Sequence, residues 1–509
     1  MGNKNEVTRY KKYAEIPETL LKEAKSLTAA SPYRQHFHIE PETGYLNDPN
    51  GFSYFDGKYH LCYQWSPLRY LSESNVWFQG WFHLTSEDLV NWTPVGPLIE
   101  PDTQYDTHGA YSGSALDLGD KLAIFYTGNV RDEQWVRTPY QVIAYMDKKG
   151  DFVRQLPPAL TGQPAGYTDH FRDPKLWRQG DDYYAVIGAQ REDKRGSCLI
   201  LHSADIHHWQ VLGEMKTNVS DTGYMWECPD YFEINDKGVL IYCPQGLKKD
   251  AKESGNIYDV FCLIGDPLNL SDLTFNNIEP QKFDFGFDIY AVQTTRLPDG
   301  RRIAIGWMGV SEMEYPTEKY GHCGTLTIPR ELSVNGDRLQ QRPIKELMKL
   351  RGACQSHRET LIPGKVFNFH SGTVFESIIT FKSERKGQLT ISLRASENGE
   401  RKTDLIIDLD NHAITLDREY SGEAVNTAYG TRRTHDYSFS HETKIQIFSD
   451  TTSLEIFIDD GLYVSSTRIF PLDGQGVMRF QTTGTDIDVN IDCWALAESR
   501  VKDETGTDD

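Results

Sequence analysis

Short apolar or alternating runs cover most of the chain, and turn sequences such as Asp-Gly, Gly-Asp and Asp-Lys-Gly separate them. Runs of this length are typical of β-strands joined by tight turns. Apolar residues at helical spacing are confined to a short segment around residues 17–27. The pattern therefore predicts an all-β protein with a single short helix near its N-terminal end.

One strand pattern returns five times at a nearly constant interval. The five runs are YHLCYQW from residue 59, KLAIFYTG from 121, DYYAVIGAQ from 182, VLIYCPQG from 239 and RRIAIGWMG from 301. Their starts are 62, 61, 57 and 62 residues apart. A second echo links SEDLVNW at 86–92 with SADIHHW at 203–209. A period near sixty residues, with several strands in each repeat, predicts a five-bladed β-propeller.

The pattern changes after the fifth repeat, and the change suggests a second domain. Runs such as VFESIITF, QLTISLRA and DLIIDLD follow one another with short polar turns, as in a β-sandwich. We expect an N-terminal helical extension at 1–30, the propeller at 31–345, a linker at 346–365, the sandwich at 366–500 and a disordered acidic tail at 501–509.

The composition of the chain limits the classes of partner that it is expected to bind. The chain of 509 residues has a formal net charge of −21, which disfavours nucleic acid and anionic membranes as partners. No run is long enough to span a membrane, and the N-terminal segment lacks the apolar core of a signal peptide. The eight cysteines are scattered without a C-x-x-C pair, as expected of reduced thiols. We expect a cytoplasmic protein; its oligomeric state stays open.

A short polar segment stands before each repeated strand. The segments are LNDPNGF, AYSGSAL, HFRDPKLW, WECPDYF and DIYAVQTT. Equivalent positions of successive blades surround one central channel, so five side chains should converge there. They are Asp48, Ser112, Asp173, Glu227 and Tyr290. A turn would explain Asp48 alone, but it does not explain three acids at matching places. Because gathered like charges are unfavourable, the convergence predicts a functional site.

The acids suit acid–base and nucleophilic chemistry on a neutral molecule. The sequence shows no metal-ligand spacing, nucleotide-binding loop or G-x-S-x-G pattern, so we expect no metal and no cofactor. Glycoside hydrolysis needs two carboxyl groups in different environments, one protonated and one ionised. A small sugar is therefore the expected partner.

Local neighbours suggest which acid is which. Trp226, Cys228 and Pro229 make an apolar surrounding that should raise the pKa of Glu227 and suit a proton donor. Asn47 and Asn50 flank Asp48 with amide donors that should stabilise its charged form, as a nucleophile requires.

Arg172 should keep Asp173 ionised, either to bind sugar hydroxyl groups or merely as an ion pair at a turn.

The motifs LNDPNG, FRDP and WECPD, in this order, closely resemble the three signature motifs of the β-fructosidases, glycoside hydrolase family 32. The resemblance continues in YSGSA, FYTGNVRD and LTIPREL and reaches the second domain at LEIFIDDG and STRIFP. It implies a five-bladed propeller with a C-terminal sandwich. It also implies a retaining mechanism with Asp48 as nucleophile, Glu227 as acid/base and Asp173 as transition-state stabiliser.

The resemblance also implies a set of substrate-binding residues. Together with Tyr290 from the repeat, the set comprises Leu46, Asn47, Gln64, Tyr111, Ser112, Arg172 and Trp307. One stretch departs from the family pattern. Two tryptophans that are usually five residues apart, each followed by Gly, are here Trp77 and Trp81, each followed by Phe. Which of them lines the pocket stays open, and the preceding LRYLSES lies where it would reshape the rim.

Several functions remain compatible with this set of residues. Within the family, the resemblance is strongest to bacterial β-fructofuranosidases that cleave sucrose 6-phosphate, and sucrose itself is an equally open substrate. The alternatives are an exo-hydrolase of fructo-oligosaccharides or inulin, an arabinan- or xylan-active propeller enzyme, and a carbohydrate-binding propeller without catalysis. The missing secretion signal favours a small substrate over a polymer.

Overall fold

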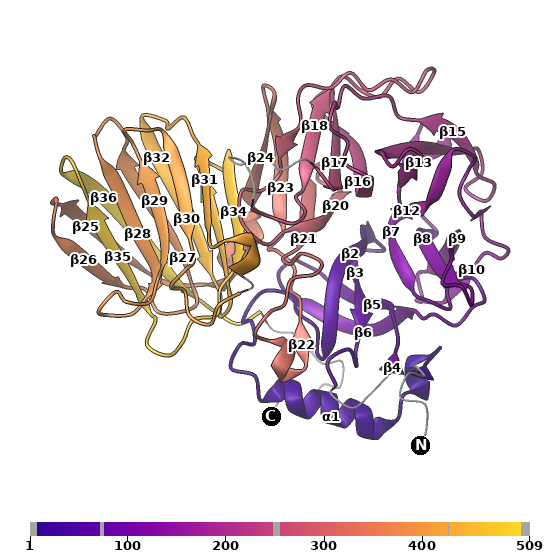
Figure 1. The fold of residues 1–509 in the computed structure, drawn as a ribbon, viewed down its shortest axis with the longest axis horizontal. Helices are drawn as coiled ribbons and strands as arrows, with labels where there is room; N and C mark the ends of the chain where they lie inside the picture. The colour runs from indigo at the N-terminus through magenta and orange to yellow at the C-terminus, as the bar shows by residue number, and fades with distance from the viewer. Residues whose placement is uncertain (1–7, 72–75, 248–254, 426, 500–509) are drawn as a thin grey trace.

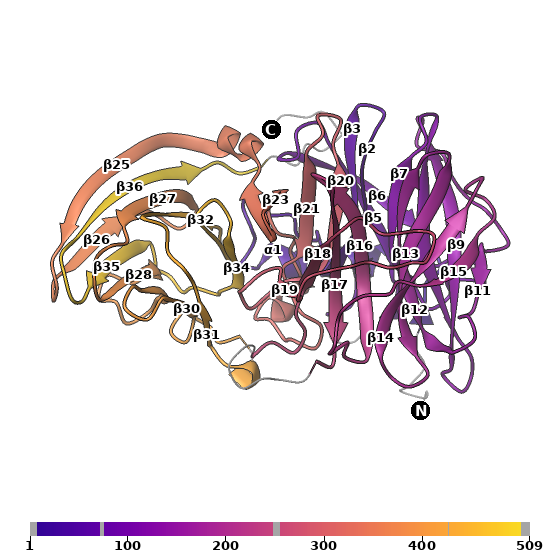
Figure 2. The same cartoon turned by 90° about the horizontal axis from the view of Figure 1, so that it is seen from above.

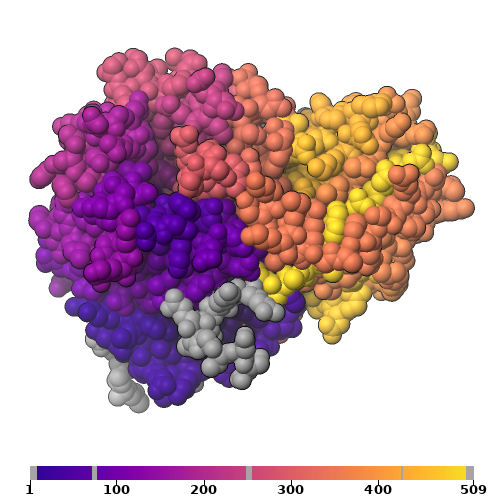
Figure 3. All heavy atoms as spheres, turned by 180° about the vertical axis from the view of Figure 1, so that it is seen from behind, coloured from indigo at the N-terminus to yellow at the C-terminus, as the bar shows by residue number. Residues whose placement is uncertain are grey.

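The computed structural model describes residues 8–71, 76–247, 255–425 and 427–499. A five-bladed β-propeller and a β-sandwich lie side by side (Figure 1), and from behind they form a larger and a smaller lobe (Figure 3). The predicted all-β fold class is confirmed. A helix, α1 (Glu18–Ala29), stands where one was expected, and it turns Ala24 and Thr28 inward.

The five blades are four- or five-stranded sheets in chain order. The first contains β22 (His322–Cys323), β2 (Gly44–Phe55), β3 (Lys58–Ser66), β5 (Gly80–Ser86) and β6 (Trp92–Ile99). The second contains β7 (Ala110–Asp117), β8 (Lys121–Arg131), β9 (Arg137–Asp147), β10 (Phe152–Arg154) and β11 (Leu160–Thr161). The third contains β12 (Tyr167–Gln179), β13 (Asp182–Arg191), β14 (Gly196–Ser203) and β15 (Gln210–Glu214).

The fourth blade contains β16 (Met225–Ile234), β17 (Lys237–Gln245), β18 (Phe261–Gly265) and β19 (Gln281–Lys282). The fifth contains β20 (Tyr290–Arg296), β21 (Arg302–Trp307), β23 (Arg330–Asn335) and β24 (Arg338–Pro343). Outside the blades, β1 (Thr8–Arg9) pairs in parallel with β4 (Val76–Trp77). Short 3₁₀ helices are η1 (Tyr13–Glu15), η2 (Glu318–Tyr320), η3 (Lys345–Leu350) and η4 (Thr427–Tyr429).

The innermost strands of the blades form a closed ring. β2, β7, β12, β16 and β20 contact one another in this order, and β20 also contacts β2. β22 follows the fifth-blade strand β21 in the chain but pairs in parallel with β2 of the first blade. This pairing links the last blade to the first and closes the ring. The five repeated runs are β3, β8, β13, β17 and β21, the second strand of every blade. Their apolar side chains are buried between neighbouring blades, which explains why this strand carries the strongest repeat.

The sandwich consists of two six-stranded sheets around one apolar cluster. One sheet contains β25 (Arg351–Leu361), β36 (Ile487–Leu496), β27 (Phe375–Lys382), β32 (Glu442–Ser449), β33 (Ser453–Ile458) and β34 (Tyr463–Arg468). The other contains β26 (Val366–His370), β35 (Val477–Thr482), β28 (Gln388–Ala395), β29 (Thr403–Asp408), β30 (Ala413–Asp417) and β31 (Arg432–Asp436).

The expected linker at 346–365 is wrong for most of its length. β25 occupies 351–361 and pairs with β36 along the edge of the sandwich (Figure 2). Nearly every residue of β25 is exposed, so the strand carries no apolar alternation that the sequence could reveal. The predicted acidic tail at 501–509 lies outside the described residues.

Candidate active site

Every innermost strand carries a β-bulge at the same point of its ladder. Two of its residues stand opposite one residue of the second strand. The pairs are Asn47–Asp48, Tyr111–Ser112, Asp173–Pro174, Cys228–Pro229 and Ala291–Val292. Asp173, Cys228 and Ala291, the first residues of three bulges, have positive φ angles of 70°, 47° and 49°. Bulges bend a strand and redirect its side chains, and here they do so at the site.

The bulges also correct the register assumed from the sequence. Asp48 and Ser112 are the second residues of their bulges, Asp173 is the first, and Glu227 and Tyr290 directly precede theirs. The five residues are therefore not at equivalent positions, although they converge. A bulge increases the local twist, so any of three successive residues can face the channel.

The five side chains line one cavity of about 330 Å³ at one end of the ring. This volume falls within the usual range for small-molecule pockets, about 300–1,000 Å³. The complete lining is Tyr45, Asn47, Asp48, Gln64, Arg69, Gln79, Tyr111, Ser112, Arg172, Asp173, Glu227, Tyr290, Ser311 and Glu312.

Asp48 is held by short polar contacts. Ser112 Oγ donates to Asp48 Oδ2 at 2.5 Å, and Asn47 Nδ2 donates to Oδ1 at 3.1 Å. Asn50 does not reach the carboxyl group; it donates to the Asp48 carbonyl at 2.8 Å and accepts the Gly113 N–H at 2.9 Å. Burial, reinforced by the charge of Glu227, raises the pKa of Asp48 despite the bond from Ser112. The expected net stabilisation of its charged form is thus wrong, because burial outweighs the hydrogen bonds.

Glu227 accepts hydrogen bonds on both carboxylate oxygens. Arg172 donates to Oε1 from Nε at 3.1 Å and also from Nη2. Tyr290 donates to Oε2 at 2.5 Å, and Gln245 Nε2 donates there at 2.8 Å. Burial raises the pKa of Glu227, but Arg172 and Tyr290 outweigh burial, so the pKa is lowered. The expected rise was wrong because the sequence neighbours of Glu227 do not include Arg172.

Asp173 is the second carboxyl group of the cavity whose pKa is raised. Arg172 Nε stands 3.9 Å from Asp173 Oδ2, because its guanidinium is bonded to Glu227 instead. The Cys228 backbone N–H donates to Oδ2 at 3.0 Å. Burial raises the pKa of Asp173 to about 7, with Glu227 and Asp48 adding to the rise. The expectation that Arg172 keeps Asp173 ionised is therefore wrong: Arg172 lowers the pKa of Asp173, but burial and the two other carboxylates outweigh it.

Most of the expected binding residues lie on the cavity. Gln64 accepts a hydrogen bond from Asn47 and donates to Ser112 Oγ at 3.3 Å, which ties the first two blades together. Leu46 and Trp307 are not among the lining residues. Leu46 is fully buried, and the rings of Tyr45 and Tyr290 cover Trp307, with centroids 5.9 and 6.3 Å away.

Neither tryptophan of the atypical stretch lines the cavity. Trp81 is fully buried and donates from Nε1 to the Tyr111 carbonyl at 3.1 Å, so it supports a lining residue from behind. Trp77 lies under the guanidinium of Arg9, 5.1 Å from the ring centre. Gln79, between the two, reaches the cavity instead and donates to Gln64 at 3.3 Å.

Five lining residues were not expected: Tyr45, Arg69, Gln79, Ser311 and Glu312. Arg69 belongs to the LRYLSES segment already expected at the rim, and Tyr45 directly precedes the LNDPNG motif. Ser311 and Glu312 follow β21 in a loop with no sequence signal for a site.

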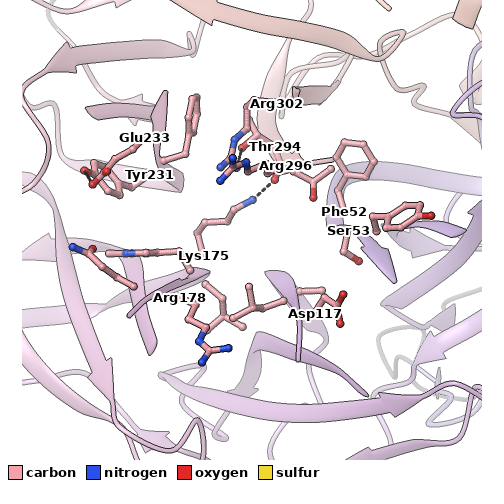
Figure 4. Close-up of a pocket in the computed structure, with 18 residues that line it drawn as sticks. Phe52, Ser53, Asp117, Lys175, Arg178, Tyr231, Glu233, Thr294, Arg296 and Arg302 are labelled. Carbon is pink, nitrogen blue, oxygen red and sulfur yellow. Dashed lines mark hydrogen bonds between the residues drawn. The ribbon is translucent and has the colours of Figure 1, made fainter. Parts of the chain in front are cut away.

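A second cavity of about 440 Å³ lies around the other ends of the same inner strands (Figure 4). Lys175 projects into it and pairs with Asp230 at 2.8 Å. Its two lining carboxyl groups, Asp117 and Glu233, stand on opposite sides of the cavity in Figure 4. Of these two cavities, only the first therefore contains paired carboxyl groups.

The described part of the chain shows neither a metal-binding cluster nor a membrane-spanning helix. Within it, no group of three or more His, Cys, Asp and Glu side chains is arranged to hold a metal ion. Among those same residues, no helix is long and apolar enough to cross a bilayer.

A propeller with several carboxyl groups of unlike environment in one cavity defines a glycosidase type of site. Residues 38–343 match the model of the glycosyl hydrolases family 32 N-terminal domain, and residues 346–495 match that of the family 32 C-terminal domain. The chain belongs to glycoside hydrolase family 32 and is a glycoside hydrolase.

Individual relatives cover nearly the whole chain. Sucrose-6-phosphate hydrolase of Staphylococcus xylosus is 40% identical over 91% of this chain and 92% of its own length. The Streptococcus mutans enzyme of the same name is 38% identical over 92% and 95%. The structure of sucrose-6-phosphate hydrolase from Lactobacillus gasseri is 34% identical, with a TM-score of 0.88 over 96% of this chain and 99% of that one. A Bombyx mori β-fructofuranosidase is 30% identical, with a TM-score of 0.81 over 95% and 97%.

Proposed function

We propose that this protein is a β-fructofuranosidase that hydrolyses the terminal β-D-fructofuranoside bond of sucrose 6-phosphate and of sucrose. The observation that carries the proposal is the pair of carboxyl groups in one cavity. Asp48 accepts hydrogen bonds from a hydroxyl and an amide group, and Glu227 accepts them from Arg172 and Tyr290. Relatives named sucrose-6-phosphate hydrolase, 34–40% identical over most of the chain, support the choice of substrate.

The proposed reaction proceeds with retention through two displacements. Asp48 attacks the anomeric carbon of the fructosyl unit, while Glu227 gives a proton to the departing glycosidic oxygen. The glycosidic bond breaks, and a fructosyl ester of Asp48 forms. Glu227, now ionised, then removes a proton from water, which attacks the same carbon and releases fructose and free Asp48.

Asp173 is proposed to bind fructosyl hydroxyl groups and stabilise the transition state. Burial raises the pKa of Asp173 to about 7, whereas Arg172 and Tyr290 outweigh burial and lower that of Glu227. Substrate hydroxyl groups that donate to Asp173 favour its ionised form, which leaves the shared proton for Glu227. Binding would thereby load the acid with the proton that the first step consumes.

The same proposal places the enzyme in the cytoplasm. Support comes from its cysteines, because all eight are free thiols and seven of them are buried. Unpaired cysteines in this number are typical of a reducing compartment.

An exo-hydrolase of inulin is the main alternative. The Aspergillus awamori exo-inulinase is 22% identical, a level at which the likeness concerns the fold. Side-by-side kinetics on sucrose, sucrose 6-phosphate, a short fructo-oligosaccharide and inulin test the proposal. We expect release of glucose or glucose 6-phosphate, slow hydrolysis of inulin, and β-fructofuranose as the first anomer seen by NMR. More efficient hydrolysis of inulin than of both disaccharides would exclude the proposed substrates, and an initial α-anomer would exclude retention.

A further inference from the structure

Arg69 stands out among the residues of the catalytic cavity. It follows β3 in the rim segment and lines the same cavity as Asp48 and Glu227. Its guanidinium lies over the ring of Tyr45, 4.2 Å from the centre, and Tyr45 in turn packs edge-on against Tyr70 and Trp307. A stacked arginine is held in place by the ring while its N–H fork stays available to an acceptor.

Arg69 is also the cation of the cavity that has no carboxylate partner. The other lining cation, Arg172, is bonded to Glu227 and lies 3.0 Å from His170 Nδ1. Among the described residues, Arg69 forms no ion pair and its guanidinium donates no hydrogen bond, and its side chain is exposed. An exposed, positioned and unpaired guanidinium at the mouth of a site is suited to bind an anion.

Because the cavity is negatively charged, Arg69 matters only for substrates that are themselves anionic. Asp48, Asp173, Glu227 and Glu312 line the cavity, and the whole chain carries a formal net charge of −21. Neutral sucrose enters such a site without electrostatic cost, whereas a phosphate dianion is repelled by the carboxylates. A phosphorylated substrate therefore needs a compensating cation within the cavity, and Arg69 is placed to supply it.

We propose that Arg69 binds the phosphate group of the substrate and thereby sets the preference for sucrose 6-phosphate over sucrose. The inference rests on the proposed β-fructofuranosidase function and names Arg69 as the residue of that site that recognises the phosphate group. The planar fork of Arg69 fits two phosphate oxygens, and the Tyr45 ring fixes its direction. Arg69 takes no part in bond breaking, so it acts on binding and specificity alone.

The test compares kcat/KM on sucrose 6-phosphate and on sucrose for the wild type and Arg69→Gln. We expect Arg69→Gln to lower the value for sucrose 6-phosphate about 10–100-fold, or about 1.4–2.8 kcal/mol at about 1.4 kcal/mol per tenfold, with a much smaller fall for sucrose. The inhibition constant of glucose 6-phosphate should rise by a similar factor, and that of glucose much less. Arg69→Lys, which keeps the charge without the fork, should lie between the two.

Arg178→Gln is the matched control. Arg178 is also an exposed arginine over a tyrosine, 5.8 Å from the Tyr183 ring centre, but it lines the second cavity (Figure 4). We expect this variant to keep the wild-type ratio of the two kcat/KM values. Melting temperatures of all variants check that each is folded.

Two outcomes would overturn the inference. The first is an unchanged ratio in Arg69→Gln, which includes an equal loss on both substrates. The second is loss of the preference in Arg137→Gln instead; Arg137 does not line the cavity and lies over Tyr111, 5.7 Å from the ring centre. A wild type that cleaves neither sugar would instead refute the proposed function, so the two failures are distinguishable.

Discussion

The pKa values of Asp48, Asp173 and Glu227 depend on one another, because the charge of Glu227 adds to burial in raising the pKa of both aspartates. Arg172 decides where the negative charge settles. It bonds to Glu227 and lowers the pKa of that carboxyl group, whereas burial raises the pKa of Asp48 and of Asp173, so a proton on the cluster favours the aspartates. A proton shared in this way is described by the apparent pKa values of the cluster, and activity should follow the loss of that proton.

The first prediction concerns the pH dependence of kcat/KM, which reports the free enzyme. Activity needs one proton on the cluster, and Asp173 has its pKa raised to about 7. We expect kcat/KM to fall as the pH rises through about 7. In Asp173→Asn this site of protonation is gone and the pKa of Glu227 is low, so the fall should begin at lower pH. Loss of a preorganised contact should also lower kcat about 10²–10³-fold. An unchanged basic limb in Asp173→Asn would contradict the shared proton.

The second prediction separates the roles of Glu227 and Asp48. Positioned proton transfer is typically worth about 10²–10⁴-fold, so Glu227→Ala should lose about that much on sucrose. With an activated aryl fructoside, whose leaving group needs no proton, the first step should be nearly normal and a burst of phenol should precede a slow steady state. Azide, which attacks without a base, should accelerate that steady state and yield a fructosyl azide.

Asp48→Asn is the comparison variant. An amide cannot attack the anomeric carbon, so both substrates should be inert whether or not azide is present. Rescue by azide in Asp48→Asn but not in Glu227→Ala would show that the two roles are reversed.

Among the elements, β22 is the smallest that bears directly on the site. Its pairing with β2 brings Gly324, which has a φ of 94°, against the backbone of Leu46, one residue before the Asn47–Asp48 bulge. A Cβ atom at Gly324 would collide with the Leu46 carbonyl oxygen. Close approach of two backbones therefore requires glycine here.

The third prediction follows from that contact. Gly324→Ala should destabilise the fold by about 1–3 kcal/mol or more through strain and should lower kcat by displacing Asp48. Denaturant unfolding and kinetics on sucrose measure the two effects. Gly336→Ala is the control, because Gly336 has a positive φ of 62° but open space where its Cβ would stand. We expect Gly336→Ala to lose less stability and to keep a normal kcat. A Gly324→Ala enzyme with normal kcat would contradict the positioning role of β22.

For the whole molecule, a buried ionic cluster joins the propeller to the sandwich. His38, ahead of the first blade, lies between Asp450 at 2.8 Å and Glu455 at 2.9 Å in the sandwich. Arg330 of β23 bonds to Glu455 at 3.1 Å and to Asp284 at 3.1 Å. Burial lowers the pKa of His38, but the two carboxylates outweigh it and raise that pKa to about 9.

The fourth prediction concerns stability against pH. The folded pKa of His38 lies above its usual value of 6.5, so its contribution is fully present below pH 6.5 and is lost as the pH rises through about 9. His38→Ala leaves two buried carboxylates short of a partner and should cost about 3–5 kcal/mol near pH 6. The deficit relative to wild type should shrink toward pH 9.5. Urea unfolding at several pH values measures it, and the exposed neighbour His36 provides the control, His36→Ala.

A deficit that stays constant from pH 6 to 9.5 would mean that the cost of His38→Ala is lost packing rather than lost charge.

The sequence by itself determined the blade count, because each second strand is an apolar run buried between two blades, and burial on both faces leaves a local signal. It also determined that Asp48, Asp173 and Glu227 meet, since each lies in the segment that precedes such a run. The echo of SEDLVNW and SADIHHW is likewise local. In both turns the Trp side chain, Trp92 or Trp209, donates to a carbonyl three residues earlier.

Only the tertiary structure decided the features that depend on residues distant in the sequence. β25 has two exposed faces, so its pairing with β36 left no apolar pattern. Arg172 and Glu227 are 55 residues apart, and their pairing reversed the pKa order that adjacent residues had suggested. The proposed role of Arg69 follows only from its position over Tyr45 at the cavity, which the sequence does not reveal. Electrostatic interactions depend on distance in space and on burial, and neither can be read from neighbouring positions in a chain.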